Sequence, residues 1–101
     1  MNRNGIITTA VVFSFVLAGP LKAEIKVGIM VPTSGSEAAY GIDMQNAIKM
    51  AADELNAKGG VLGDKFVTFV ADDGCDPQMA TAAASKLTSN EVTAVLGGCC
   101  R

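Results

Sequence analysis

The sequence predicts an α/β fold, built as a β-α-β-α-β succession with a parallel, doubly wound sheet of strand order 2-1-3. Three observations predict this class. Strand-like apolar runs alternate with helical patterns after residue 23. The first of these runs becomes apolar on both faces, as strands do when helices cover both sides of a sheet. Right-handed crossovers through helices of about 13 to 17 residues then place the first strand in the middle.

The first strand and the first helix follow from periodicity. Residues 24–31 (EIKVGIMV) are typical of a buried parallel strand, and residues 32–41 (PTSGSEAAYG) predict a loop. A helix is expected over residues 42–58, where Gly59-Gly60 ends it. Its predicted inward face consists of Met44, Ile48, Ala51, Ala52 and Leu55, and its polar face of Asp43, Asn46, Lys49, Asp53 and Asn56.

The second half of the chain repeats the pattern. Residues 65–71 (KFVTFVA) predict a strand from their Phe, Val and Thr content. Asp76 is predicted to cap the next helix, with Pro77 at its first position, where a missing N–H costs nothing. That helix is expected to end near Ser89, and residues 92–96 form the third predicted strand. Its predicted inward face is Ala80, Ala83, Ala84 and Leu87.

The first 23 residues predict an export signal. Arg3 supplies the positive charge, residues 6–18 are an uncharged apolar run, and Gly19-Pro20 interrupts any helix. Cleavage after Ala23 would begin the mature chain at Glu24, with cleavage after Ala18 and an uncleaved anchor as the alternatives. The sequence therefore predicts residues 1–23 as a signal peptide and the periplasm of a Gram-negative bacterium as the location.

Composition excludes several functions. Residues 24–101 carry six basic and ten acidic side chains, a net charge of −4, and the chain has no His and no Trp. Nucleic-acid binding is not expected, because no basic patch can track a phosphate backbone. No cofactor is predicted. Because three strands and two helices bury too little surface for a finished domain, residues 24–101 are expected to be the N-terminal portion of a larger, truncated protein.

Ligands of parallel sheets bind at the carboxyl edge, where three predicted loops meet: residues 33–41, 72–76 and 97–101. The first leads into a helix N-terminus, which favours an anion such as a carboxylate. Ser34 adds a hydroxyl donor, and Tyr40 offers a ring face and a hydroxyl. Roles in the loop, the helix cap and the core are the alternatives for these residues.

An acidic group and three cysteines share this edge. Asp72, Asp73 and Asp76 resemble a hard-cation or phosphotransfer cluster, but Asp76 is explained as a cap, so no metal site is predicted. In an exported protein the cysteines should pair. Bridging Cys75 to Cys100 would close a loop of about 25 residues and contribute about 3 kcal/mol. Pairing of Cys75 with Cys99, and a vicinal bridge between Cys99 and Cys100, are competitors that composition does not separate.

The ordered motifs resemble the start of the branched-chain amino-acid (leucine/isoleucine/valine) binding proteins of bacterial ABC importers. The resemblance covers residues 24–101, and it rests on residues 24–29 (EIKVGI), 34–35 (SG), 40–41 (YG), 56–61 (NAKGGV), 72–77 (DDGCDP) and 95–97 (VLG). It implies the N-terminal lobe of a type I periplasmic binding protein, a Cys75–Cys100 disulfide, and Tyr40 in the ligand cleft. Arg101 stands where the family commonly has a carboxylate-binding Ser, and an Arg can also pair with a carboxylate.

The resemblance implies a solute-binding component that is not an enzyme. Its expected partners are a small amino acid and the permease and ATPase of an ABC importer. The alternatives are a binding protein for another small acid or amide, a small exported enzyme using Asp72 and Asp73, and a non-functional truncated product. An enzyme is disfavoured because the sequence offers no nucleophile–base pair.

Overall fold

The structure is a computed structural model that describes residues 23–100. The predicted signal peptide and Arg101 therefore lie outside the described residues. Five elements follow one another in the order strand, helix, strand, helix, strand, as the sequence predicts. They are β1 (Glu24–Val31), α2 (Ala38–Ala57), β2 (Lys65–Asp72), α3 (Pro77–Ser89) and β3 (Ala94–Gly97).

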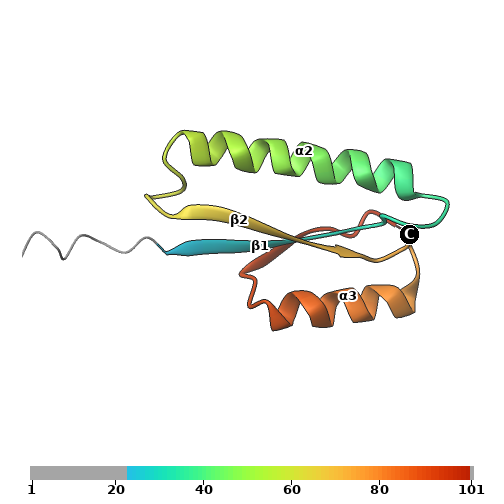
Figure 1. Ribbon diagram of the computed structural model, residues 1–101. Helices are drawn as coiled ribbons and strands as arrows, with labels where there is room; N and C mark the ends of the chain where they lie inside the picture. Colours follow the sequence, from blue (N-terminus) through green and yellow to red (C-terminus); the bar gives the residue numbers. More distant parts are fainter. Residues whose placement is uncertain (1–22, 101) are drawn as a thin grey trace, which may run out of the picture.

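The three strands form one parallel sheet in the order β2-β1-β3. The register aligns Val27 of β1 with Thr68 of β2 and with Ala94 of β3. Helix α2 covers one face of the sheet and α3 the other (Figure 1). Both helices pack on β1 and β2, and neither packs on β3. The predicted α/β class and the strand order 2-1-3 are confirmed.

The central strand supplies the core. Val27, Ile29 and Val31 are buried. Gly28 faces α3, since a Cβ placed on it would lie 2.8 Å from a methyl carbon of Leu87 in that helix. Because successive side chains of a strand point to opposite faces, the three buried residues point toward α2.

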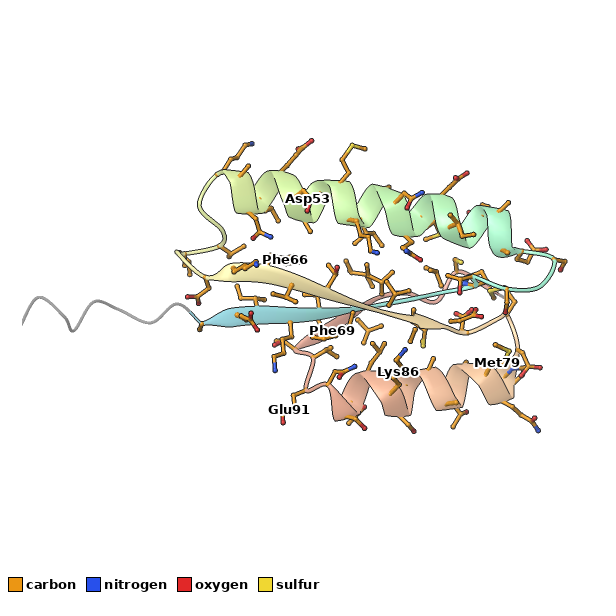
Figure 2. The ribbon with its side chains drawn as sticks, viewed as in Figure 1. Asp53, Phe66, Phe69, Met79, Lys86 and Glu91 are labelled. Carbon is orange, nitrogen blue, oxygen red and sulfur yellow. A yellow bond between two sulfur atoms is a disulfide. The ribbon has the colours of Figure 1, made fainter. Side chains whose placement is uncertain are left out.

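The second strand supplies side chains to both layers. Phe66 lies on the α2 side of the sheet and Phe69 on the α3 side (Figure 2). Phe69 packs against the cluster of Ala71, Ala83 and Leu87. Small Ala side chains on α3 thus let that helix approach the sheet closely.

The predicted start of the first helix is wrong. Helix α2 begins at Ala38, four residues before the expected Ile42. The N–H of Ala38 donates to the carbonyl of Gly35, and Gly41 is helical and buried. The sequence rule treated Gly41 as a loop residue, but here the missing side chain lets the helix turn pass close to Pro32.

Two further details of the prediction differ. Ala51, Leu55 and Ala84 are exposed, although periodicity placed them inward. Asn56, placed on the polar face, accepts from the N–H of Phe66 and donates to its carbonyl, both at 2.8 Å. These two bonds fix the end of α2 to the start of β2.

The ends of the second helix match the expectation more closely. The Asp76 carboxylate accepts from the N–H groups of Gln78 and Met79, both at 2.9 Å, and Pro77 occupies the first helical position. The third strand starts at Ala94, two residues after its predicted start. Val92 instead packs against the cluster between α3 and the sheet, and its N–H donates to the carbonyl of Leu87 at 3.4 Å. Neither α2 nor α3 has the length and hydropathy of a membrane span.

Candidate functional site

The carboxyl edge of the sheet carries the candidate site. The start of α2, the start of α3 and the segment that follows β3 lie at this same edge (Figure 1). A pocket of about 330 Å³ opens there. It is lined by Pro32, Glu37, Tyr40, Cys75, Cys99 and Cys100.

Tyr40 forms part of the pocket wall from the first turn of α2 rather than from a loop. Its side chain is 60% exposed, so it does not serve the core. The structure therefore favours a surface role over the core-packing alternative for this residue. An exposed tyrosine ring at a pocket wall can cover an apolar ligand and still present its hydroxyl to water.

The start of α2 provides polar groups of both signs. Among the described residues, the N–H groups of Ala39 and Tyr40 have no acceptor, because the first intrahelical bond runs from Gly41 to the carbonyl of Glu37. Free N–H groups at a helix start attract a carboxylate. The Glu37 side chain lines the same pocket and can attract an ammonium group. The two features together suit a zwitterion.

Asp72 organises the loops behind the pocket. One carboxylate oxygen accepts from the N–H of Thr33 at 2.7 Å and from the N–H of Gly74 at 2.8 Å. The other oxygen accepts from the hydroxyl of Ser34 at 2.5 Å. Asp72 thus joins the loop after β1 to the loop after β2. Its oxygens are used for structure, which argues against the enzyme alternative.

These hydrogen bonds change the acidity of Asp72. The Ser34 hydroxyl, followed by the Thr33 N–H, lowers the pKa of the Asp72 carboxyl to about 2, against the opposing effect of burial. The ordinary value in an unfolded chain is about 3.9. Folding therefore favours the ionised form. Its stabilising contribution is complete above about pH 4 and is lost as the pH falls through 2.

Replacing Asp72 by asparagine should remove this contribution. We expect Asp72→Asn to lower the free energy of unfolding by about 1 kcal/mol at neutral pH, allowing for solvent screening. The difference from the parent chain should shrink between pH 4 and pH 2. Urea unfolding at several pH values, followed by circular dichroism, measures it with residues 24–100 carried in place of the matching segment of a full-length relative. Asp53→Asn, at an exposed position of α2, is the control, and an equal acid dependence of the two variants would contradict the assignment.

Ser34 is placed differently from the prediction. Ser34 does not line the pocket, and its hydroxyl donates a hydrogen bond to the Asp72 carboxylate. A hydroxyl has one hydrogen, so Ser34 can offer a ligand only an acceptor. Its ligand-binding role stays a prediction, as does that of Arg101. Sequence reasoning missed Glu37 and Pro32, although Glu37 is the only charged residue of the predicted loop 32–41, which was an available signal.

The structure joins Cys75 to Cys100 by a disulfide, with Cα atoms 5.4 Å apart, and leaves Cys99 free among the described residues. Asp73 lies beside the bridge, 4% exposed, and accepts from the N–H of Cys75 at 3.0 Å. The ligand atoms of Asp73, Cys75 and Cys100 lie within 4.8 Å of one another. Because both sulfurs are bonded to each other, they are not thiolate ligands, and this cluster is not a metal site in the oxidised chain.

Comparison with known proteins gives a consistent result. The family described as periplasmic binding protein matches residues 24–100. The chain is 37% identical over 91 residues to the Leu/Ile/Val-binding protein BraC3 of Rhizobium johnstonii, covering 90% of this chain and 25% of the relative. It is 39% identical over 95 residues to the leucine-specific-binding protein of Salmonella typhimurium, covering 93% and 26%.

A solved structure shows the same arrangement of elements. The branched-chain amino acid transporter substrate-binding protein LivJ from Streptococcus pneumoniae, in complex with isoleucine, superposes with a TM-score of 0.68 at 36% identity. The match covers 71% of this chain and 21% of that one. The chain thus spans about a quarter of the length of these curated relatives.

Proposed function

Since this chain belongs to the periplasmic binding protein family, we propose that it forms one wall of the ligand site of a periplasmic solute-binding component of an ABC importer. The proposed ligand is a branched-chain or related amino acid. The named relatives are binding proteins for leucine, isoleucine and valine, and they are binding proteins rather than enzymes.

The observation that carries the proposal is the composition of the pocket. Pro32, the Tyr40 ring and the disulfide supply apolar surface, and Glu37 supplies a carboxylate. The N–H of Tyr40, a lining residue, has no acceptor among the described residues and offers a donor for a ligand carboxylate. A wall that combines apolar surface with polar groups of opposite sign suits a small apolar amino acid.

Binding without chemistry is the second part of the proposal. The carboxylates of Asp72 and Asp73 accept hydrogen bonds from their own loops. They therefore hold the wall of the pocket in shape rather than act on a ligand. The partners in this proposal are the permease and the ATPase of the importer, and Arg101 and Ser34 stay candidate ligand contacts.

Export is the third part of the proposal, and it is directly testable. Because Arg3, the apolar run of residues 6–18 and Ala23 form a signal pattern, we expect the chain to be released into the periplasm with Glu24 at its N-terminus. N-terminal sequencing of the periplasmic fraction measures this. Recovery of chains that retain Met1 in the membrane fraction would contradict it, and an N-terminus at Gly19 would move the cleavage site to Ala18.

Tyr40 gives the sharpest test of ligand binding. Residues 24–100 are grafted in place of the matching segment of the leucine-specific-binding protein of Salmonella typhimurium, and calorimetry measures leucine, isoleucine and valine binding. We expect the graft to bind at least one of them. Tyr40→Ala should weaken binding about tenfold, because it removes an apolar wall worth about 1.5 kcal/mol or more.

Met50→Ala is the matched control. Met50 lies on the same helix and is 61% exposed, close to the 60% of Tyr40, but it does not line the pocket. The 101-residue chain by itself should give no calorimetric signal, because one wall leaves the ligand solvated. Tight leucine binding by that chain, or equal effects of the two substitutions in the graft, would overturn the proposal. A graft that binds a different small acid or amide would redirect it to that ligand class.

A further inference from the structure

The third cysteine is unused by the proposed function. Cys99 is half-buried and free, and it lines the same pocket as the bridged Cys75 and Cys100. A free thiol beside a disulfide can exchange with it, since a thiolate attacks a disulfide sulfur and displaces the other. The question is whether the fold allows Cys99 to take the place of Cys100.

Distance permits the replacement. The Cα atoms of Cys75 and Cys100 are 5.4 Å apart. Because consecutive Cα atoms are about 3.8 Å apart, the Cα of Cys99 lies no more than about 9 Å from that of Cys75. Disulfides span Cα distances up to about 6.8 Å. A shift of a few ångström therefore suffices.

The backbone can make this shift on the Cys100 side of the bridge, and not on the Cys75 side. Gly97 and Gly98 have φ values of +133° and +73°, and nothing lies within 4 Å of a Cβ placed on Gly98. The N–H of Gly98 donates to the carbonyl of Met30 at 3.0 Å. Within the described part of the chain, residues 99–100 make no backbone–backbone hydrogen bond. Cys75, in contrast, is held in place because its backbone N–H donates a hydrogen bond to the Asp73 carboxylate. Reorientation of residues 99–100 about Gly98 leaves Cys75 in place.

Chain entropy does not choose between the two pairings. Bridging Cys75 to Cys99 closes a loop one residue shorter than the 25-residue separation of the present bridge, a negligible difference. Local contacts must decide instead. The Sγ of Cys100 lies 4.0 Å from an oxygen of the Asp73 carboxylate, which is 4% exposed. A bridged sulfur has no hydrogen to donate to this carboxylate, whereas a Cys100 thiol has one.

We propose that Cys99 and Cys100 are alternative partners of Cys75, and that exchange between them changes which of the two carries the free thiol at the pocket. The Cys99 thiol loses its proton and its thiolate attacks the Sγ of Cys75. The Cys75–Cys99 bond forms as the Cys75–Cys100 bond breaks. Cys100 leaves as a thiolate, takes up a proton, and the resulting thiol donates a hydrogen bond to the Asp73 carboxylate. One disulfide and one thiol are present before and after, so the step needs no oxidant or reductant.

Peptide mapping tests the exchange on the whole chain. The oxidised chain is incubated in mildly alkaline buffer without oxygen, acid-quenched at intervals and labelled with N-ethylmaleimide. Trypsin cuts after Lys65, Lys86 and Arg101, so that Cys75 lies on peptide 66–86 and the other two cysteines on peptide 87–101. Fragment ions that separate Cys99 from Cys100 show which one carries the label.

The expected result is label mainly on Cys99, with a fraction on Cys100 that rises with time to a plateau of at least about 1% of the molecules. In denaturant Cys99 and Cys100 should be labelled about equally, because bridging either of them to Cys75 closes a loop of nearly the same length. Asp73→Asn should lower the native plateau about two- to fivefold, because a neutral acceptor holds the Cys100 thiol less well. An unchanged plateau in that variant would remove Asp73 from the proposal.

Two controls separate exchange from other thiol chemistry. Cys99→Ser combined with Ser89→Cys, at the far end of α3, keeps one free thiol but should leave the label on residue 89 throughout. Cys100→Ser should still form a bridge, now from Cys75 to Cys99. Label confined to Cys99 in the native chain at all times would overturn the proposal. So would label on Cys75 as the main second product, since that would mean attack on Cys100.

Discussion

Gly41→Ala is expected to destabilise the chain by about 2 kcal/mol or more, although alanine is the better helix former. Helix propensity alone predicts a gain of about 1 kcal/mol for this change. However, a Cβ on Gly41 would overlap the carbonyl oxygen of Pro32, a backbone atom that follows the buried end of β1. Because neither partner is a flexible side chain, the first turn of α2 must move away from the sheet.

Helix propensity and the overlap with Pro32 change the free energy of unfolding in opposite directions, so the sign of the measured change shows which of them dominates. Urea unfolding of the grafted protein with and without the substitution, monitored by circular dichroism, gives the change in free energy. Ala47→Gly, at an exposed position of the same helix, should cost about 1 kcal/mol through propensity alone. Stabilisation by Gly41→Ala would show that α2 does not approach Pro32. The same displacement should reduce ligand binding in the grafted protein, since Tyr40 precedes Gly41 in that turn.

Cys75→Ser is expected to lower the free energy of unfolding by about 3 kcal/mol. The bridge closes a loop with a sequence separation of 25, and its loss returns that conformational freedom to the unfolded chain. Folded domains are stable by only about 5 to 15 kcal/mol, so in the grafted protein the loss should be visible as a large shift in the urea midpoint.

Two measurements check the cause. Reduction of the parent chain with a dithiol should bring its stability down to that of Cys75→Ser, and reduction of the variant should change little. Cys99→Ser should stay within about 0.5 kcal/mol of the parent, because it leaves the Cys75–Cys100 bridge intact. Equal stability of the parent chain with and without the dithiol would contradict a stabilising bridge.

Signals carried by neighbouring residues were sufficient for much of the fold. The period of residues 24–31, the Asp76-Pro77 helix start and the Gly59-Gly60 stop each reflect interactions within a few positions of the chain. The handedness of crossovers then determines the strand order without any knowledge of side-chain packing. The same reasoning brought Tyr40 and the cysteines to one sheet edge, because the loops after parallel strands share that edge.

Contacts between distant residues decided the rest. Whether Gly41 ends a loop or enters a helix depends on how closely that turn approaches Pro32. Likewise, Asn56 leaves the polar face only because Phe66 offers a backbone donor and acceptor across ten residues of chain. Neither contact leaves a trace in the local pattern of apolar and polar residues.

The site shows the same division. From the sequence by itself come the α/β class, the strand order, the resemblance to the periplasmic binding proteins, and predictions of export and of the edge at which a ligand would lie. Only the tertiary structure shows that Ser34 donates to Asp72, 38 positions away, and that Glu37 joins the pocket wall. The physical reason is that a hydroxyl or carboxylate takes its role from the partner it meets, and that partner is supplied by folding rather than by the neighbouring sequence.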